Sequence, residues 1–232
     1  MYLEAALALL ALLLALLCRP WRMLASRPGP YGVQAPAASK LITPMLAVLV
    51  LLPWIWALPT LHKMPLQLQW SAAPLVVILL GWPLAVPTLI ATGAIVFAIS
   101  PALSISDALS IIVWQGLVPA TLAMLWGVVV RRWCWHHIFV FILLRGFFGT
   151  VLCIFLASLL GQWAGHVLPN VGDDLSRMAR WLMAWSDGVT TGMLTAVFVV
   201  FRPQWVATWS DAIYLQPVPA VEKTDTKNSD QP

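Results

Sequence analysis

The stretch IFVFILLRGFFGTVLCIFLASLLG, from Ile138 to Gly161, decides the fold of this chain. About 20 apolar residues in a helix cross the roughly 30 Å hydrocarbon core of a bilayer, so this run predicts a transmembrane helix. Arg145 is the only charged residue between Trp133 and Gly172. An arginine at that depth costs about 2.5–3.5 kcal/mol on insertion scales, and such residues usually face the bundle interior and have a partner. The run therefore predicts a helical membrane protein in which Arg145 faces inward.

A residue of opposite charge occurs in the last apolar run, ARWLMAWSDGVTTGMLTAVFVVF, which contains Asp187. Arg145 follows His137 by eight residues (145 − 137), and Asp187 follows Ala179 by eight (187 − 179). Each charge would then lie about 12 Å from its own end of a span. If the two spans are antiparallel across a core of roughly 30 Å, the charges lie within about 6 Å of the same depth. We therefore predict an intramembrane ion pair, which either staples the helices or lines a substrate, ion or proton pathway.

Small residues accompany both charges. Gly146 and Gly149 follow Arg145, while Gly188 and Gly192 follow Asp187 as a GxxxG pattern. Small side chains let two helix backbones approach closely inside a membrane. These four glycines are therefore predicted to be helix-packing positions.

The composition supports the membrane class. Hydrophobic residues make up 61% of the 232 residues and charged residues 9%, against about 45–50% and 25% in soluble domains. The net charge of +4 comes from scattered basic residues rather than from a basic block, so nucleic-acid binding is not expected. The three cysteines have no short paired spacing and predict no disulfide framework.

Seven candidate spans follow from the apolar runs. They are Leu3–Leu17, Leu41–Leu58, Ser71–Gly81, Leu84–Ile99, Ala108–Val130, Ile138–Gly161 and Ala179–Phe201. The third and fourth are short and separated only by Gly81-Trp82-Pro83, so they could be two short crossings, one long kinked helix or a re-entrant pair. If the pair is instead a single kinked helix, the chain has six spans. Residues 1–215 are expected to form one integral membrane domain, and the polar residues 216–232 a disordered tail.

Charge asymmetry favours seven spans with the N-terminus outside and the C-terminus inside. That topology places seven basic residues at the inner loops and span ends against three outside, the C-terminal tail excluded, as the positive-inside rule requires. The inner residues are Arg19, Arg22, Arg27, Lys40, Arg131, Arg132 and Arg202. The predicted location is the inner membrane of a bacterium, with the lipid bilayer as an obligatory partner.

Soluble catalytic motifs are absent from the sequence. GxSxG, HExxH, Walker A and GxGxxG do not occur, so we expect no enzyme, no catalytic residue and no cofactor. His136 and His137 are adjacent, so on a helix they would point about 100° apart and rarely ligate one metal ion together. No metal site is predicted.

Several short motifs resemble one known family. They are IFVFI and RGFFG (138–142, 145–149), GML (192–194), FVVFRPQW (198–205), DAIYL (211–215), GWPLA (81–85) and GLVP (116–119). Together they resemble an uncharacterised bacterial polytopic membrane family labelled as energy-coupling-factor transporter permeases. That family is distantly similar to the cobalt and nickel uptake permease subunits. The resemblance covers most of the chain from Leu68 to Leu215.

The chain departs from the metal-uptake subunits at their ligands. Those subunits begin Met-His, whereas this chain begins Met1-Tyr2, and Gln69 stands where they carry a histidine. A carboxamide is a poorer ligand than imidazole for Co²⁺ or Ni²⁺. Gln69 is accordingly the residue that the resemblance makes substrate-facing.

The resemblance implies a permease-like subunit of an energy-coupling-factor uptake transporter, with transition-metal ions as the inherited substrate class. Such a subunit works with an ATP-binding-cassette ATPase and a coupling transmembrane subunit. The alternative is a membrane protein without transport activity that assists assembly or anchors partners, in which case Arg145 and Asp187 are only a staple.

Overall fold

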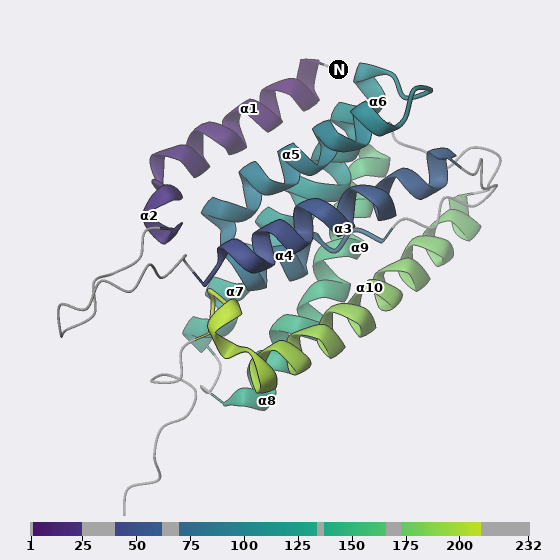
Figure 1. The fold of residues 1–232 in the computed structure, drawn as a ribbon. Helices are drawn as coiled ribbons and strands as arrows, with labels where there is room; N and C mark the ends of the chain where they lie inside the picture. The colour runs from purple at the N-terminus through teal and green to yellow at the C-terminus, as the bar shows by residue number, and fades with distance from the viewer. Residues whose placement is uncertain (1, 25–39, 62–69, 134–136, 166–172, 210–232) are drawn as a thin grey trace, which may run out of the picture.

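The computed structural model describes residues 2–24, 40–61, 70–133, 137–165 and 173–209. Every regular element in these ranges is a helix, which confirms the predicted all-α class for the described part of the chain. The helices lie side by side as an elongated bundle (Figure 1). The predicted tail, residues 216–232, lies outside the described residues.

Five helices are long and apolar enough to cross a membrane, which confirms the membrane class. They are Ile42–Pro59 within α3 (Ile42–Leu61), Trp82–Ile99 (α5), Ile105–Trp133 (α6, η1 and α7), Ile138–Trp163 (α8, η2 and α9) and Leu175–Phe201 within α10 (Asp173–Phe201). The first helix, α1 (Tyr2–Leu17), is apolar but shorter. The number of crossings and the side on which each terminus lies stay predictions.

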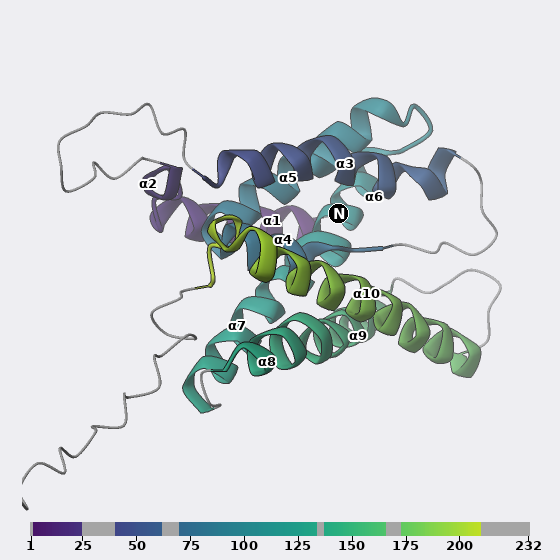
Figure 2. The ribbon, with the colours of Figure 1, turned by 60° about the horizontal axis from the view of Figure 1, so that its bottom comes forward.

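The short helix α4 (Ala73–Leu80) lies at the centre of the bundle. All eight of its residues are buried, and it contacts α3, α5, α7, α9 and α10. Figure 2 shows it between the layer of α3 and α5 and the layer of α9 and α10. Eight residues rise only about 12 Å, so α4 alone does not cross a core of roughly 30 Å.

The chain reverses direction between α4 and α5. Gly81 separates the two helices with φ 76° and ψ 152°, a conformation that only glycine adopts readily. Val77 of α4 and Trp82 of α5 line the same cavity as Arg131 at the end of α7. α4 is therefore about half as long as α5, and the two are separate helices. They do not form the single long kinked helix that was one of the alternatives.

Basic residues gather at one end of the bundle. Gly81 lies close to Met23 of α2 (Trp21–Leu24) and to Ala207, which follows η3 (Pro203–Trp205). The same end contains the end of α1, the start of α5 and the end of α7. We call it the arginine-rich end; its arginines are Arg19, Arg22, Arg131, Arg132 and Arg202. All five belong to the set expected on one membrane face, while Arg27 lies outside the described residues.

Two of the long helices contain a π-helical segment. η1 (Ile111–Leu117) lies between α6 (Ile105–Ser110) and α7 (Val118–Trp133). η2 (Phe141–Phe147) lies between α8 (Ile138–Val140) and α9 (Phe148–Trp163). π-helical turns are rare and occur frequently at functional sites. Each segment here carries one polar residue of an otherwise apolar stretch, Gln115 in η1 and Arg145 in η2.

Candidate functional site

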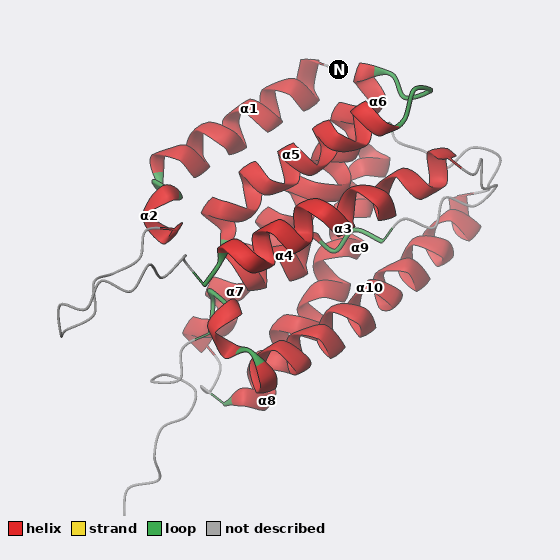
Figure 3. Ribbon diagram, in the orientation of Figure 1, coloured by secondary structure: helices red, strands yellow, loops and turns green. Residues whose placement is uncertain are grey.

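Asp187 lies in the middle of α10 and points at the start of α4. Its side chain is 2% exposed, and its Oδ2 accepts a hydrogen bond of 3.1 Å from the backbone N–H of Ser71. Helix N-termini carry a partial positive charge and N–H groups without intrahelical acceptors. The side chain of Asp187 therefore supplies an acceptor just before α4 begins inside the bundle. Figure 3 shows the loop that leads into α4 at the centre of the helices.

Ser71 is held from three directions by hydrogen bonds. Its carbonyl oxygen accepts from Trp56 Nε1 of α3 at 3.2 Å, and its hydroxyl donates to the carbonyl oxygen of Gln115. Gln115 Nε2 in turn donates to the carbonyl oxygen of Trp70 at 3.3 Å. We call Trp56, Trp70, Ser71, Gln115 and Asp187 the central polar cluster. It joins α3, η1 and α10 around the start of α4.

Some polar atoms near this cluster have no hydrogen-bond partner among the described residues. These are Gln115 Oε1, the hydroxyl of Thr191 and Nε1 of Trp70, all buried atoms. Thr191 follows Asp187 by one helical turn, so the two side chains share one face of α10. Buried polar atoms are nearly always satisfied, so orphaned ones indicate a place for water or a ligand.

The backbone is strained at the same place. Ala72, which precedes α4, has φ 51° and ψ 0°, in the left-handed region that residues with a Cβ seldom adopt. Such conformations cost about 1–3 kcal/mol and gather at functional sites. The strain lies between Ser71 and the first turn of α4, where the chain changes from loop to helix inside the protein.

Arg145 lies in a different environment from Asp187. Its guanidinium group lies against Gly127 of α7, where a Cβ would be 2.8 Å from Nη2. Its Cζ is 5.4 Å from the ring centroid of Phe141. Arg145 also lines a cavity at the arginine-rich end.

The register of η2 and α9 against α10 separates the two charges in depth. A Cβ on Gly146 would meet Thr195, whereas a Cβ on Gly188 would meet Val151. This antiparallel register places Arg145 and Asp187 roughly 10–13 Å apart along the helix axes, more than the 6 Å expected. The expectation counted each depth from its own span end and had no information on the offset between the helices. The depth match behind the predicted ion pair is therefore not found.

The predicted packing glycines lie at close helix contacts. Gly146, Gly188 and Gly192 lie between η2–α9 and α10, and a Cβ on Gly192 would be 3.1 Å from Phe147 Cβ. Gly149 instead faces α7, where a Cβ would be 2.5 Å from Trp126 Cδ1. Gly127, which the sequence analysis did not single out, makes room for the guanidinium of Arg145.

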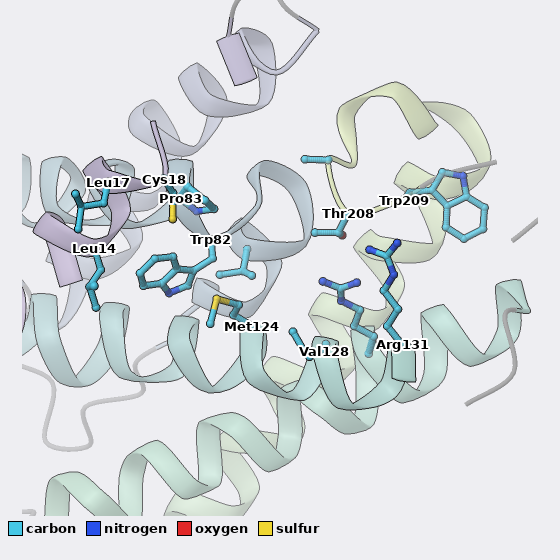
Figure 4. Close-up of a pocket in the computed structure, with 14 residues that line it drawn as sticks. Leu14, Leu17, Cys18, Trp82, Pro83, Met124, Val128, Arg131, Thr208 and Trp209 are labelled. Carbon is cyan, nitrogen blue, oxygen red and sulfur yellow. The ribbon is translucent and has the colours of Figure 1, made fainter. Parts of the chain in front are cut away.

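The cavity at the arginine-rich end has a volume of about 750 Å³. Its lining contains two arginines, Arg131 and Arg145, and no acidic side chain among the residues that the structure describes. Figure 4 shows Arg131 reaching toward Thr208 and Trp209, with Leu14, Leu17 and Cys18 across the cavity. The other lining residues are Val77, Trp82, Pro83, Met124, Gly127, Val128 and Ala207.

Sequence reasoning missed two of the residues that matter here. Gln115 is a lone amide in an apolar span, and that contrast was the available signal. Arg131 was assigned only to charge asymmetry, because its cavity depends on how α1, α5 and α7 pack. Gln69 lies outside the described residues, although Trp70 and Ser71 next to it belong to the central polar cluster.

No set of three His, Cys, Asp or Glu side chains in the described ranges is close enough to hold a metal ion. His136 lies outside the described residues, and His137 is exposed just before α8. The donor atoms of the central polar cluster are oxygens and amide or indole nitrogens.

No protein-family model, curated protein or solved structure matches this chain.

Proposed function

We propose that this chain is a permease-like membrane transport protein with its binding site at the central polar cluster. One observation carries the proposal: a half-length helix begins at the centre of the bundle, and the backbone N–H of Ser71, just before that helix, donates to a buried carboxyl group. Transporters build their sites from such discontinuous helices near the bilayer midplane. An ionisable residue at that depth is expensive and usually serves a substrate, ion or proton pathway.

The donor atoms favour a small hard cation or a proton as the bound species. Asp187 offers a carboxylate, and Gln115 and Thr191 offer oxygens that have no partner in the described part of the chain. Oxygen donors suit alkali and alkaline-earth cations, whereas imidazole and thiolate donors suit transition metals. Within the proposal, a hard cation or proton therefore ranks above the transition-metal ions that the family resemblance implies.

The family resemblance adds partners to this proposal. The sequence contains no Walker A motif, so energy for uptake would come from an ATP-binding-cassette ATPase and a coupling membrane subunit, or from the bound ion itself. The arginine-rich end would face the bacterial cytoplasm, in accord with the positive-inside rule. The ATPase would be located in the cytoplasm, so it would dock at the arginine-rich end.

Cation-dependent thermal stability of the purified full chain tests the binding site. A ligand at ten times its Kd stabilises by about 1.4 kcal/mol, which raises the Tm by about 3–6 °C. We expect Na⁺ or K⁺, or a change of pH, to produce such a shift in the wild type. Asp187→Asn should abolish it, whereas Asp107→Asn should keep it, because Asp107 is exposed in the first turn of α6.

Two results would count against parts of this proposal. A shift produced by Co²⁺ or Ni²⁺ and not by alkali cations would overturn the ligand class but leave a permease. If no cation shifts the Tm, and Asp187→Asn and Asp107→Asn respond alike, the proposed binding site is wrong. Affinity purification from native membranes then decides the class: an ATPase with a second membrane subunit supports transport, whereas another membrane assembly supports the role in assembly or anchoring.

A further inference from the structure

We propose that the cavity at the arginine-rich end binds the phosphodiester headgroup of an anionic phospholipid. The site is separate from the central polar cluster and does not depend on the proposed transport function. It is defined by Arg131 and Arg145, which line one cavity of about 750 Å³. Ligand sites in proteins have volumes of about 300–1,000 Å³.

The two arginines present their charge on one face of α7. The guanidinium of Arg145 lies against Gly127, and Gly127 and Arg131 are four residues apart, so they occupy neighbouring turns of the same face. Both guanidinium groups therefore present positive charge to one cavity. No acidic side chain belongs to the lining within the described residues, and arginine forks match phosphate oxygens in bidentate geometry.

The rest of the lining favours a lipid over a soluble phosphate compound. Leu17 on one side is 76% exposed and Val128 on the other is 59% exposed, so the apolar walls of the cavity continue onto the outer surface of the bundle. An acyl chain could follow that surface while its headgroup enters the cavity. Trp82 and Trp209 also line it, and tryptophan is enriched at the level of lipid headgroups.

The location agrees with known physics of lipid recognition. Basic pockets between helices at the cytoplasmic side bind anionic headgroups, and each arginine near the surface contributes about 1 kcal/mol. The loss of one arginine should therefore weaken lipid binding about fivefold. Arg132 supplies the matched control, because it is the next residue on α7 and is exposed, yet it does not line the cavity.

Native mass spectrometry of the full chain with added phosphatidylglycerol or phosphatidylcholine tests the assignment. We expect one phosphatidylglycerol to be retained in preference to phosphatidylcholine, about fivefold less in Arg131→Gln, and unchanged in Arg132→Gln. Arg131 is exposed, so its replacement should not impair folding. Equal retention of the two lipids, or equal loss in both variants, would overturn the proposal.

Alkylation of Cys18 gives a second readout at the same cavity. Cys18 is a free, exposed cysteine in the lining, and peptide mass spectrometry reports it separately from the other cysteines. Phosphatidylglycerol in nanodiscs should slow alkylation of Cys18 relative to phosphatidylcholine in the wild type and not in Arg131→Gln. If millimolar inorganic phosphate protects Cys18 equally well without anionic lipid, the ligand is a soluble phosphate compound and the lipid assignment is wrong.

Discussion

Replacement of Gly149 by alanine tests a close contact between α7 and α9. A Cβ at this position would lie 2.5 Å from Trp126 Cδ1 and 2.7 Å from the carbonyl oxygen of Leu144. That same oxygen accepts a 2.8 Å hydrogen bond from Trp126 Nε1. A methyl group therefore has to displace the indole ring, the backbone, or both.

The expected cost follows from three contributions. Overpacking costs about 1–3 kcal/mol, and loss of the hydrogen bond between Trp126 and Leu144 costs about 0.5–1.5 kcal/mol. Alanine offsets about 0.5–1 kcal/mol because it is the better helix former. The Gly149→Ala variant should therefore be destabilised by about 0.5–4 kcal/mol, which lowers the Tm by about 1–16 °C.

Gly161 on the same helix provides the control. Its nearest neighbour, Trp114 Cε3, would lie 3.4 Å from a Cβ, an ordinary contact. Gly161→Ala should leave the Tm unchanged or raise it slightly. Tryptophan fluorescence during thermal unfolding in one detergent measures both variants. If Gly149→Ala unfolds at the same temperature as Gly161→Ala, the packing of Trp126 against α9 is not as the structure has it.

Three further substitutions probe the two ends of α4 and the face of α10 that carries Asp187. Gly81→Ala should destabilise the protein by about 1–3 kcal/mol, because φ 76° and ψ 152° is a conformation that only glycine adopts readily. Thermal unfolding should give Gly81→Ala a lower Tm than Gly161→Ala. Ser71→Ala should cost about 1–3 kcal/mol, since it leaves buried backbone groups without partners, and an unchanged unfolding curve would contradict those hydrogen bonds. Thr191→Val should keep the stability of the cation-free protein but reduce the cation-dependent rise in Tm, and an undiminished rise would exclude Thr191 from the site.

The membrane class and most helix positions could be predicted because they depend on local composition. Leu84–Ile99 was expected and α5 spans Trp82–Ile99, and the run from Ile138 appears as one continuous helical unit. Apolar length is a property of the segment itself, since a bilayer demands about 20 such residues. Ser71–Gly81 was the weakest prediction, and there the helix begins only at Ala73.

The sequence could not supply the offset between helices. The distance in depth between Arg145 and Asp187 depends on how Gly146 and Gly188 dock on the neighbouring helix, and glycine spacing allows more than one docking position. The π-helical segments were equally invisible, because no residue preference marks them. Both features depend on tertiary packing, as does the central polar cluster around Asp187.

Substitutions of Asp187 distinguish its structural role from its proposed function. The N–H of Ser71 needs an acceptor, because Ser71 is buried inside the bundle. An asparagine oxygen would meet that need without the cost of a buried charge, so packing alone does not explain a carboxylate. Asp187→Leu should therefore lower stability by about 1–3 kcal/mol through the orphaned N–H, whereas Asp187→Asn should fold normally and lose only the cation response. If Asp187→Asn unfolds as early as Asp187→Leu, the charge itself holds α4 in place and its role is structural.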